Sequence, residues 1–265
     1  MVSEFTVEFG RPEEREAFIR KHERFFERIG NLLEALKIAT IKVNTTLSNA
    51  EIVIDALCTL CAEDFNQVRL LSANGCGHGA LTILRGMFEK LVTARYLELH
   101  PHEVYKFWDY HVVKVSKLKL DDILKKLDPD GSKLAQFKVA SKQGGRKRLQ
   151  NRWTNIDFVR MAEEVGLGEY VRNAYHFPLE FAHPSVIAVL SLFERIDGQL
   201  TIKENGPQPD SAKMALSMAH FFLLNILLLQ VEHYKIEDNP IFQQSIDDYV
   251  YIWGKERPSP DEPLI

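Results

Sequence analysis

The stretch that decides the fold runs from Leu71 to His100, LSANGCGHGALTILRGMFEKLVTARYLELH. From about Gly77 it predicts one helix, because its polar residues recur at steps of three or four, as on one face of a helix with 3.6 residues per turn. Nearly every other position before Arg95 is apolar or small, which is typical of a buried helix. The polar residues are His78, Thr82, Arg85, Glu89, Thr93 and Tyr96. We expect this stripe to face an internal cleft, a partner or polar groups of other helices.

The composition is that of an ordinary globular protein. The chain has 265 residues, 45% hydrophobic and 26% charged, and its formal net charge of −4 is too small to indicate a class of partner. Three cysteines and a charged N-terminus without an apolar leader predict the reducing cytoplasm. The apolar run Met214–Val231 contains His220 and Asn225, so we expect a buried bundle helix and no membrane partner.

One helical domain is expected over residues 1–253, followed by a disordered tail over 254–265. Its expected parts are an N-terminal helix (11–47), central helices (48–127), a basic mobile connection (128–155) and a second helical half (156–235) with a hairpin near 190–203. The hairpin is predicted by Asp197-Gly198 between two short β-prone runs. The predicted fold class is therefore an all-α, multi-helix bundle with one small β-hairpin insertion.

Two helix boundaries can be predicted. Ser48 or Asn49 can cap a helix that carries Glu51 in its first turn. At the other boundary, His100-Pro101 ends the central helix, because proline restricts the residue before it and has no amide hydrogen to donate.

The connection over 128–155 differs from the rest of the chain in its charge. Between Gly131 and Asn155 there are seven lysine or arginine residues and no acidic residue. This pattern is typical of a solvated connection, but it also fits an electrostatic contact with phosphates, helped by Trp153 and Asn155. In that second interpretation, the residues that steer nucleic acid include Lys142, Arg146, Lys147, Arg148 and Arg152.

Arg85 and Glu89 lie one helical turn apart and can form a salt bridge. The arginine has five donors, so it could hold the glutamate and still grip a phosphate or carboxylate. Equally, the two side chains could simply neutralise each other in a polar layer between helices. The candidate residues for phosphate binding or for such a polar network are Arg85, Glu89, Tyr175, Ser185 and His78.

A second polar cluster surrounds Pro178 and Pro184. It contains Arg172, Asn173, Tyr175, His176, Glu180, His183 and Ser185. Histidine is the natural acid–base near neutral pH, and an arginine can stabilise charge that develops on a phosphate. The candidate catalytic residues are therefore His183, ahead of His176, together with Arg172, although structural histidines would give the same pattern.

Other site types are disfavoured, and neither a metal nor a cofactor is expected. Cys58, Cys61, Cys76 and His78 could be read as zinc ligands, but the first two lie in an apolar helical run. The Gly-x-Ser-x-Gly elbow of a serine hydrolase is absent from the sequence. The glycines around Cys76 do not follow a predicted strand, which argues against a phosphate-binding loop.

Two stretches carry a resemblance to a known group of proteins. LLSANGCGHGALTILRGMFEKLVTARYL, followed by AYHFPLEFAHPSV, resembles a widespread bacterial family of helical proteins of unknown function. The resemblance covers about Asn49–Glu232 and implies an all-α bundle with a small hairpin. The polar residues that it implies are shared are Arg85, Glu89, Tyr175, His183 and Ser185.

This architecture is similar to HEPN-type bundles, many of which are metal-independent ribonucleases that act as dimers in toxin and antiviral systems. Arg172-Asn173-Ala174-Tyr175-His176 resembles a compressed form of their Arg…His signature. The resemblance implies an RNA-binding homodimer or metal-independent endoribonuclease of bacterial defence or stress response. Two alternatives stay open: a non-catalytic helical interaction module with a buried Arg/Glu/Tyr/His network, and a small-molecule or nucleotide site in the bundle.

Overall fold

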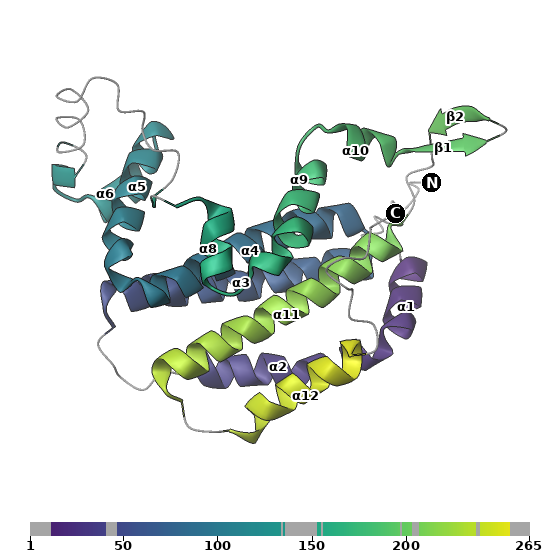
Figure 1. Ribbon diagram of the computed structural model, residues 1–265, viewed down its shortest axis with the longest axis horizontal. Coiled ribbons are helices and arrows are strands. Elements are labelled where there is room, and N and C mark those ends of the chain that lie inside the picture. Colours follow the sequence, from purple (N-terminus) through teal and green to yellow (C-terminus); the bar gives the residue numbers. More distant parts are fainter. Residues whose placement is uncertain are drawn as a thin grey trace, which may run out of the picture.

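The computed structural model is an all-α bundle with a small β-hairpin, which confirms the predicted fold class (Figure 1). It describes residues 12–40, 47–133, 135, 153–154, 156–196, 198–202, 207–236 and 239–254. The α-helices are α1 (Pro12–Lys21), α2 (Glu23–Thr40), α3 (Asn49–Ala73), α4 (Gly77–Leu99), α5 (Val104–Lys117), α6 (Asp121–Leu127), α8 (Phe158–Glu164), α9 (Phe177–Ala182), α10 (Val186–Leu190), α11 (Pro209–Tyr234) and α12 (Pro240–Trp253). The other described elements are the 3-10 turns η1 (Pro101–Glu103) and η2 (Gly168–Tyr170), the π-helical turn η3 (Arg172–His176), and strands β1 (Phe193–Ile196) and β2 (Gln199–Ile202).

The core is built around α3, α4 and α11, which pack against one another. In Figure 1, α11 runs diagonally across the pair formed by α3 and α4, and α2 and α12 lie together beyond it. The middle of α4 is fully buried, with Leu84, Met87 and Phe88 at 0% exposure. Further contacts to α4 come from α8, α9 and η3. The nearly all-round apolar sequence of α4 therefore corresponds to the central position of this helix.

The glycine-rich start of α4 is a close helix crossing. A Cβ atom at Gly77 would lie 2.5 Å from the carbonyl oxygen of Gln208 and 2.7 Å from the backbone nitrogen of Ala212, at the start of α11. The backbone N–H of His78 donates to Oε1 of Gln208 at 3.4 Å, and the Gln208 N–H donates to the carbonyl of Gly75 at 2.9 Å. Glycine is needed here because the two backbones touch. The α4 N-terminus is thus occupied by the protein itself.

The predicted helix boundaries are found where a local hydrogen bond or a proline sets them. Ser48 and Glu51 form the capping box of α3, in which each side chain accepts the other residue's backbone N–H. The end of α4 at Leu99, just before His100-Pro101, is also as predicted.

The N-terminal helical segment is interrupted, where the sequence pattern indicates one helix. It consists of α1 and α2 with a turn at His22 between them. The ring of His22 is buried and lies 4.4 Å from the ring of Phe18 and 6.1 Å from the ring of Trp253. The turn is therefore set by contacts with α12, which a local helical pattern does not contain.

A short arm made of α10, β1 and β2 extends from the bundle (Figure 1). The strands are antiparallel, Phe193 pairs with Ile202, and Ile196 pairs with Gln199 across a two-residue turn. Gly198 in this turn has a φ of +81°, a conformation that side chains other than glycine adopt at a cost. The large apolar residues of the arm that are 47–73% exposed are Val186, Ile187, Val189, Leu190, Leu192, Ile196 and Ile202.

Helix α11 is apolar enough to cross a membrane by length and composition, with a mean hydropathy of 1.9 over its most apolar window. In this fold, however, 72% of that window is buried by the rest of the protein. Its polar residue His220 is 1% exposed, and its ring accepts a hydrogen bond from Trp253. In the described structure α11 is a core helix of the bundle.

Candidate functional site

The polar stripe of α4 contributes a three-residue network in the middle of the helix. Nη2 of Arg85 lies 2.9 Å from Oε1 of Glu89, and the two side chains are 22% and 41% exposed. The guanidinium of Arg85 also lies over the ring of Tyr175 on η3, with 4.6 Å between Cζ and the ring centroid. The structure thus brings together three of the five residues that the sequence suggests for phosphate binding or a polar network. The network joins α4 to η3 and holds the glutamate carboxylate in one orientation.

The rest of the stripe does not form one continuous site. Thr82 and Thr93 donate to backbone carbonyls of α4 itself, at 3.0 Å and 2.8 Å. Tyr96 is buried. The ring of His78 stacks on Phe181 with 4.0 Å between centroids, and its burial lowers the pKa of the imidazole. His78 is thus held against α9, away from the Arg85 network.

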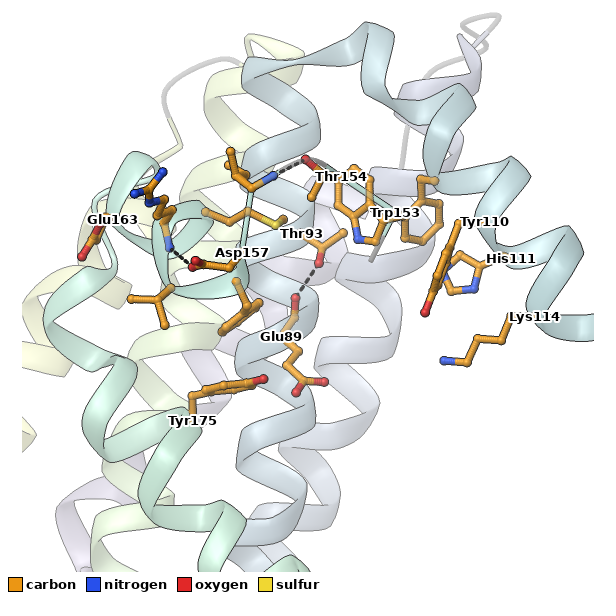
Figure 2. Close-up of a pocket in the computed structure, with 16 residues that line it drawn as sticks. Glu89, Thr93, Tyr110, His111, Lys114, Trp153, Thr154, Asp157, Glu163 and Tyr175 are labelled. Atoms are coloured by element: carbon orange, nitrogen blue, oxygen red, sulfur yellow. Dashed lines mark hydrogen bonds between the residues drawn. The ribbon is translucent and has the colours of Figure 1, made fainter. Parts of the chain in front are cut away.

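A cleft of about 810 Å³ opens beside the network (Figure 2). Its floor is α4, one side is α5, and the other sides are α8, η3 and the segment that precedes α8. The lining residues are Glu89, Thr93, Phe107, Tyr110, His111, Lys114, Trp153, Thr154, Ile156, Asp157, Phe158, Val159, Arg160, Met161, Glu163 and Tyr175. This volume lies within the range of small-molecule and cofactor pockets.

Two groups of aromatic rings form opposite parts of the cleft wall. On the α5 side, the ring of Trp153 meets the ring of Phe107 edge to face, with 5.3 Å between centroids. On the other side, Phe158 stacks on Tyr175 at 4.4 Å. Figure 2 shows Tyr110 on the α5 side, across the opening from Tyr175. Phe158 and the arginine guanidinium cover the two faces of the Tyr175 ring, so a planar ligand in this cleft would stack on the α5 side and meet the edge and hydroxyl of Tyr175 on the other.

Some charged side chains of the cleft have hydrogen-bond or charged partners within the protein, and others do not. Glu89 is bound to Arg85, and the carboxylate of Asp157 accepts the Arg160 backbone N–H at 3.0 Å as the cap of α8. Among the described residues, neither Lys114 nor the guanidinium of Arg160 has a carboxylate partner. Two cations are thus available to an anionic part of a ligand.

His111 lies beside Tyr110 and near Lys114 on the α5 side of the cleft (Figure 2). Burial lowers the pKa of its imidazole, and the neighbouring charge of Lys114 lowers it further. Near neutral pH the ring is therefore uncharged. A neutral imidazole offers one hydrogen-bond donor and one acceptor to a ligand.

The predicted catalytic residues lie beside the cleft, and none of them lines it. Arg172 and His176 are exposed at the two ends of η3, where the N–H of Phe177 donates to the carbonyl of Arg172. His183 is exposed after α9. Within the described residues, no hydrogen bond or ion pair joins Arg85 to any of the three. The charged partner of Arg85 in the described structure is Glu89.

The π-helical turn has a local cause. Pro178 lies two residues after the turn, lacks an N–H group, and would clash with the carbonyl four residues earlier in a regular α-helix. The wider turn relieves this clash, and π-turns of this kind are frequent at functional sites. The helix is thus irregular just before Pro178, where a π-turn carries Tyr175 into the cleft wall.

Ser185 has a structural part in the arm. Its hydroxyl donates to the carbonyl of Glu180 at 2.8 Å and accepts the N–H of Ala188 at 3.0 Å, which caps α10. Both functions of the hydroxyl are used within the protein. Ser185 therefore does not belong with Tyr175 and Glu89 in a shared binding site.

The residues predicted to steer nucleic acid, Lys142, Arg146, Lys147, Arg148 and Arg152, lie outside the described residues. Of the cysteines considered as zinc ligands, Cys58 and Cys61 are buried and Cys76 is exposed. In the described part of the chain, no three His, Cys, Asp or Glu side chains come together as a metal site would require.

Sequence reasoning missed most of the cleft. Phe107, Tyr110 and Trp153 come from two separate stretches, and only the packing of α5 against the segment before α8 brings them together. A signal was present, because aromatic residues are dense in α5 and a tryptophan directly follows the basic stretch. No local pattern, however, predicts which of these rings face each other.

Comparison with known proteins assigns the chain to a family. A model of DUF5677, a family of unknown function, matches residues 51–200. The chain belongs to DUF5677. No curated protein and no solved structure matches it. The resemblance to a helical family of unknown function is thereby confirmed, over a shorter range than the sequence analysis gave it.

The DUF5677 match has a clear relation to the structure. Residues 51–200 include nearly all of α3, the whole of α4 and every residue that lines the cleft. Helices α1, α2, α11 and α12 lie outside the match. The cleft is therefore a feature of the DUF5677 region. The helices outside the match, α11 above all, complete the core against α3 and α4.

Proposed function

We propose that the protein binds single-stranded RNA by taking an unstacked base into the aromatic cleft. The observation that carries the proposal is the set of aromatic side chains that line the cleft, with Trp153 and Tyr110 on the α5 side and the edge of Tyr175 across the opening. Single-stranded nucleic acids are held by stacking of bases on aromatic side chains, at about 1–3 kcal/mol for each base. A neutral imidazole, a threonine and a fixed carboxylate add hydrogen-bonding groups to the same cleft.

The charges fit the same ligand. Lys114 and Arg160 lack carboxylate partners among the described residues and can contact the phosphates that flank a bound base. The basic stretch over 133–152 adds long-range attraction in this proposal, since it is joined through the chain to Trp153 in the cleft wall. We place this activity in the cytoplasm, in bacterial defence or stress response, on the strength of the HEPN resemblance.

The binding test compares two tyrosines of α5. Tyr110 lines the cleft, whereas Tyr105 is 59% exposed on the same helix and lies outside it. Fluorescence anisotropy with labelled single-stranded RNA should show binding that weakens roughly tenfold in Tyr110→Leu, because one stacking surface is lost. Tyr105→Leu should bind as the wild type does. Equal affinity of the two variants, or no binding by the wild type, would contradict the proposal.

A second candidate is metal-independent RNA cleavage, favoured by one observation. Arg172 and His176 are both exposed on η3, and Tyr175 of the same turn lines the cleft. RNA held at Tyr175 would pass close to this pair, with His183 as the further acid–base candidate. Cleavage in a chelating buffer should be lost in His176→Ala or Arg172→Ala, while RNA binding is retained. Absence of cleavage by the wild type would leave a binding protein only.

The non-catalytic interaction module remains the alternative function. The observation in its favour is the network of Arg85, Glu89 and Tyr175, which fixes α4 against η3 without a ligand. If this alternative holds, Arg85→Met should lower the free energy of unfolding. Neither the wild type nor any variant should then bind RNA. The anisotropy experiment above separates the two functions.

Self-association forms part of the proposal, with a second copy packing on the arm. The hairpin has two open strand edges, and an antiparallel edge can pair with its own copy across a twofold axis. The exposed apolar residues of the arm form the kind of patch that marks interaction sites. Sedimentation should give a dimer for the wild type and a monomer for Ile187→Glu. A monomeric wild type would contradict this part.

A further inference from the structure

One carboxylate of the cleft, that of Glu89, is held in position by a neighbouring arginine. Glu89 lies on the polar stripe of α4 and is 41% exposed, and Arg85 binds its Oε1 at 2.9 Å. The guanidinium is in turn held over the Tyr175 ring. Because each carboxylate oxygen has two lone pairs, Oε1 can accept a second hydrogen bond beside Oε2. Glu89 thus presents two neighbouring acceptors in a defined direction.

The other carboxylates of the cleft are less suited to this task. Asp157 already accepts a backbone N–H as the cap of α8. Glu163 is exposed on α8, and Figure 2 shows it at the far end of that helix from the aromatic rings of α5. Of these carboxylates, Glu89 is therefore the one best placed to accept hydrogen bonds from a ring that is stacked on the α5 side of the cleft.

The edges of the four RNA bases differ in what they offer to such a group. Guanine has two adjacent donors on one edge, the ring N1–H and the 2-amino group. Adenine and cytosine have one amino donor next to a ring acceptor, and uracil has one N–H between two carbonyls. An ionised carboxylate only accepts hydrogen bonds, so it matches the guanine edge and is repelled by the acceptors of the other bases.

We propose that the cleft selects guanine, with the carboxylate of Glu89 accepting the N1–H and the 2-amino group of the base. This inference rests on the proposed function, that a base enters the cleft. Arg85 acts as a positioning residue, since it holds the carboxylate and does not touch the base. Stacking on Trp153 and Tyr110, on the α5 side of the cleft, is common to all bases and supplies affinity without selection.

The first test uses the wild-type protein and short RNA oligomers that differ in one central base, with uridines around it. Guanosine should bind most tightly, and inosine, which lacks the 2-amino group, should bind roughly tenfold or more weakly, because a hydrogen bond to a charged group is lost. Equal binding of adenosine and guanosine would overturn the guanine inference and leave RNA binding in place. Failure of every oligomer to bind would overturn both.

The second test compares two substitutions that remove the same charge. In Glu89→Gln the side chain has one acceptor and one donor, so the preference for guanosine over adenosine should fall to less than about threefold. In Glu163→Gln the preference should stay as in the wild type. Retained preference in Glu89→Gln, or its loss in Glu163→Gln, would overturn the assignment to Glu89. The oligomer series in the wild type tests guanine selection even if Glu89→Gln folds poorly.

Discussion

Two clusters of aromatic rings, each around a histidine, differ in their exposure to solvent. We call the buried one the closed cluster and the one in the cleft the open cluster. In the closed cluster, between α2, α11 and α12, His220 and Trp253 are 1% and 3% exposed. Nε1 of Trp253 donates to Nδ1 of His220 at 3.0 Å, and Phe25 packs on the same imidazole. In the open cluster, Trp153 and His111 line a cleft that reaches solvent.

The clusters differ in whether their polar groups have hydrogen-bond or charged partners within the protein. In the closed cluster the nearby Asp248 accepts hydrogen bonds from Asn31 at 2.7 Å and from Gln244 at 2.9 Å. In the cleft, the indole N–H of Trp153 has no acceptor among the described residues, and Lys114 has no carboxylate. Similar residue types thus stabilise the fold when they satisfy one another, and can bind a ligand when they do not.

The largest effect should come from the tryptophan of the closed cluster. Trp253→Ala removes a fully buried ring and leaves His220 without its donor, so the free energy of unfolding should fall by about 3–5 kcal/mol. Urea denaturation measures this change. A loss below about 1 kcal/mol would mean that α12 contributes little to the core.

Acid should destabilise the protein through the same closed cluster. Burial lowers the pKa of His220 from 6.5 to about 3. Between these two values the unfolded chain binds a proton that the folded protein excludes, so stability is complete above pH 6.5 and falls as the pH drops toward 3. At pH 5 the loss should be about 2 kcal/mol, since one pKa unit corresponds to about 1.4 kcal/mol.

The control for this pH dependence is His220→Gln. Glutamine can still accept the Trp253 N–H but does not titrate. Its free energy of unfolding should therefore change less than that of the wild type between pH 7 and pH 5. The same slope in both proteins would assign the acid sensitivity to other groups.

The matched change in the open cluster should affect binding more than stability. Trp153→Ala removes one stacking surface of the cleft, so affinity for single-stranded RNA should fall about tenfold. Its stability cost should be below that of Trp253→Ala, because the Trp153 side chain is only partly buried. If the two alanine variants lost equal stability and Trp153→Ala bound RNA normally, the contrast between the clusters would fail.

The smallest effect should come from one cation of the cleft. Lys114→Ala should weaken RNA binding a few-fold for every sequence, because a phosphate contact carries no base information. The slope of log affinity against log salt concentration should fall by about 0.7, the value for one contact to a single strand. Lys117→Ala, on the same helix but outside the cleft lining, serves as the control.

Much of the fold could be predicted because its causes are local. The period of the polar residues placed α4, the capping box at Ser48 placed α3, and the proline after His100 ended α4. The Arg85–Glu89 pair followed from the same period. These features depend on residues within one or two turns of each other, which a sequence shows directly.

The cleft could not be predicted, because its causes are distant. Trp153 meets Phe107 only when the segment before α8 lies against α5, a helix more than forty residues earlier in the chain. The separation of His183 from Arg85 has the same origin. Polar residue types indicated a site on α4 and η3, but the aromatic residues around Glu89 and Tyr175 are set by tertiary packing.

The π-helical turn at Arg172–His176 acts as a spacer in the chain. A π-turn contains one residue more than the α-helical turn that it replaces, and each residue of an α-helix rotates the chain by about 100°. Deleting one residue here would turn Tyr175 away from the cleft while Pro178 and α9 keep their places. The length of this segment, as much as its composition, keeps one aromatic wall aligned with the other.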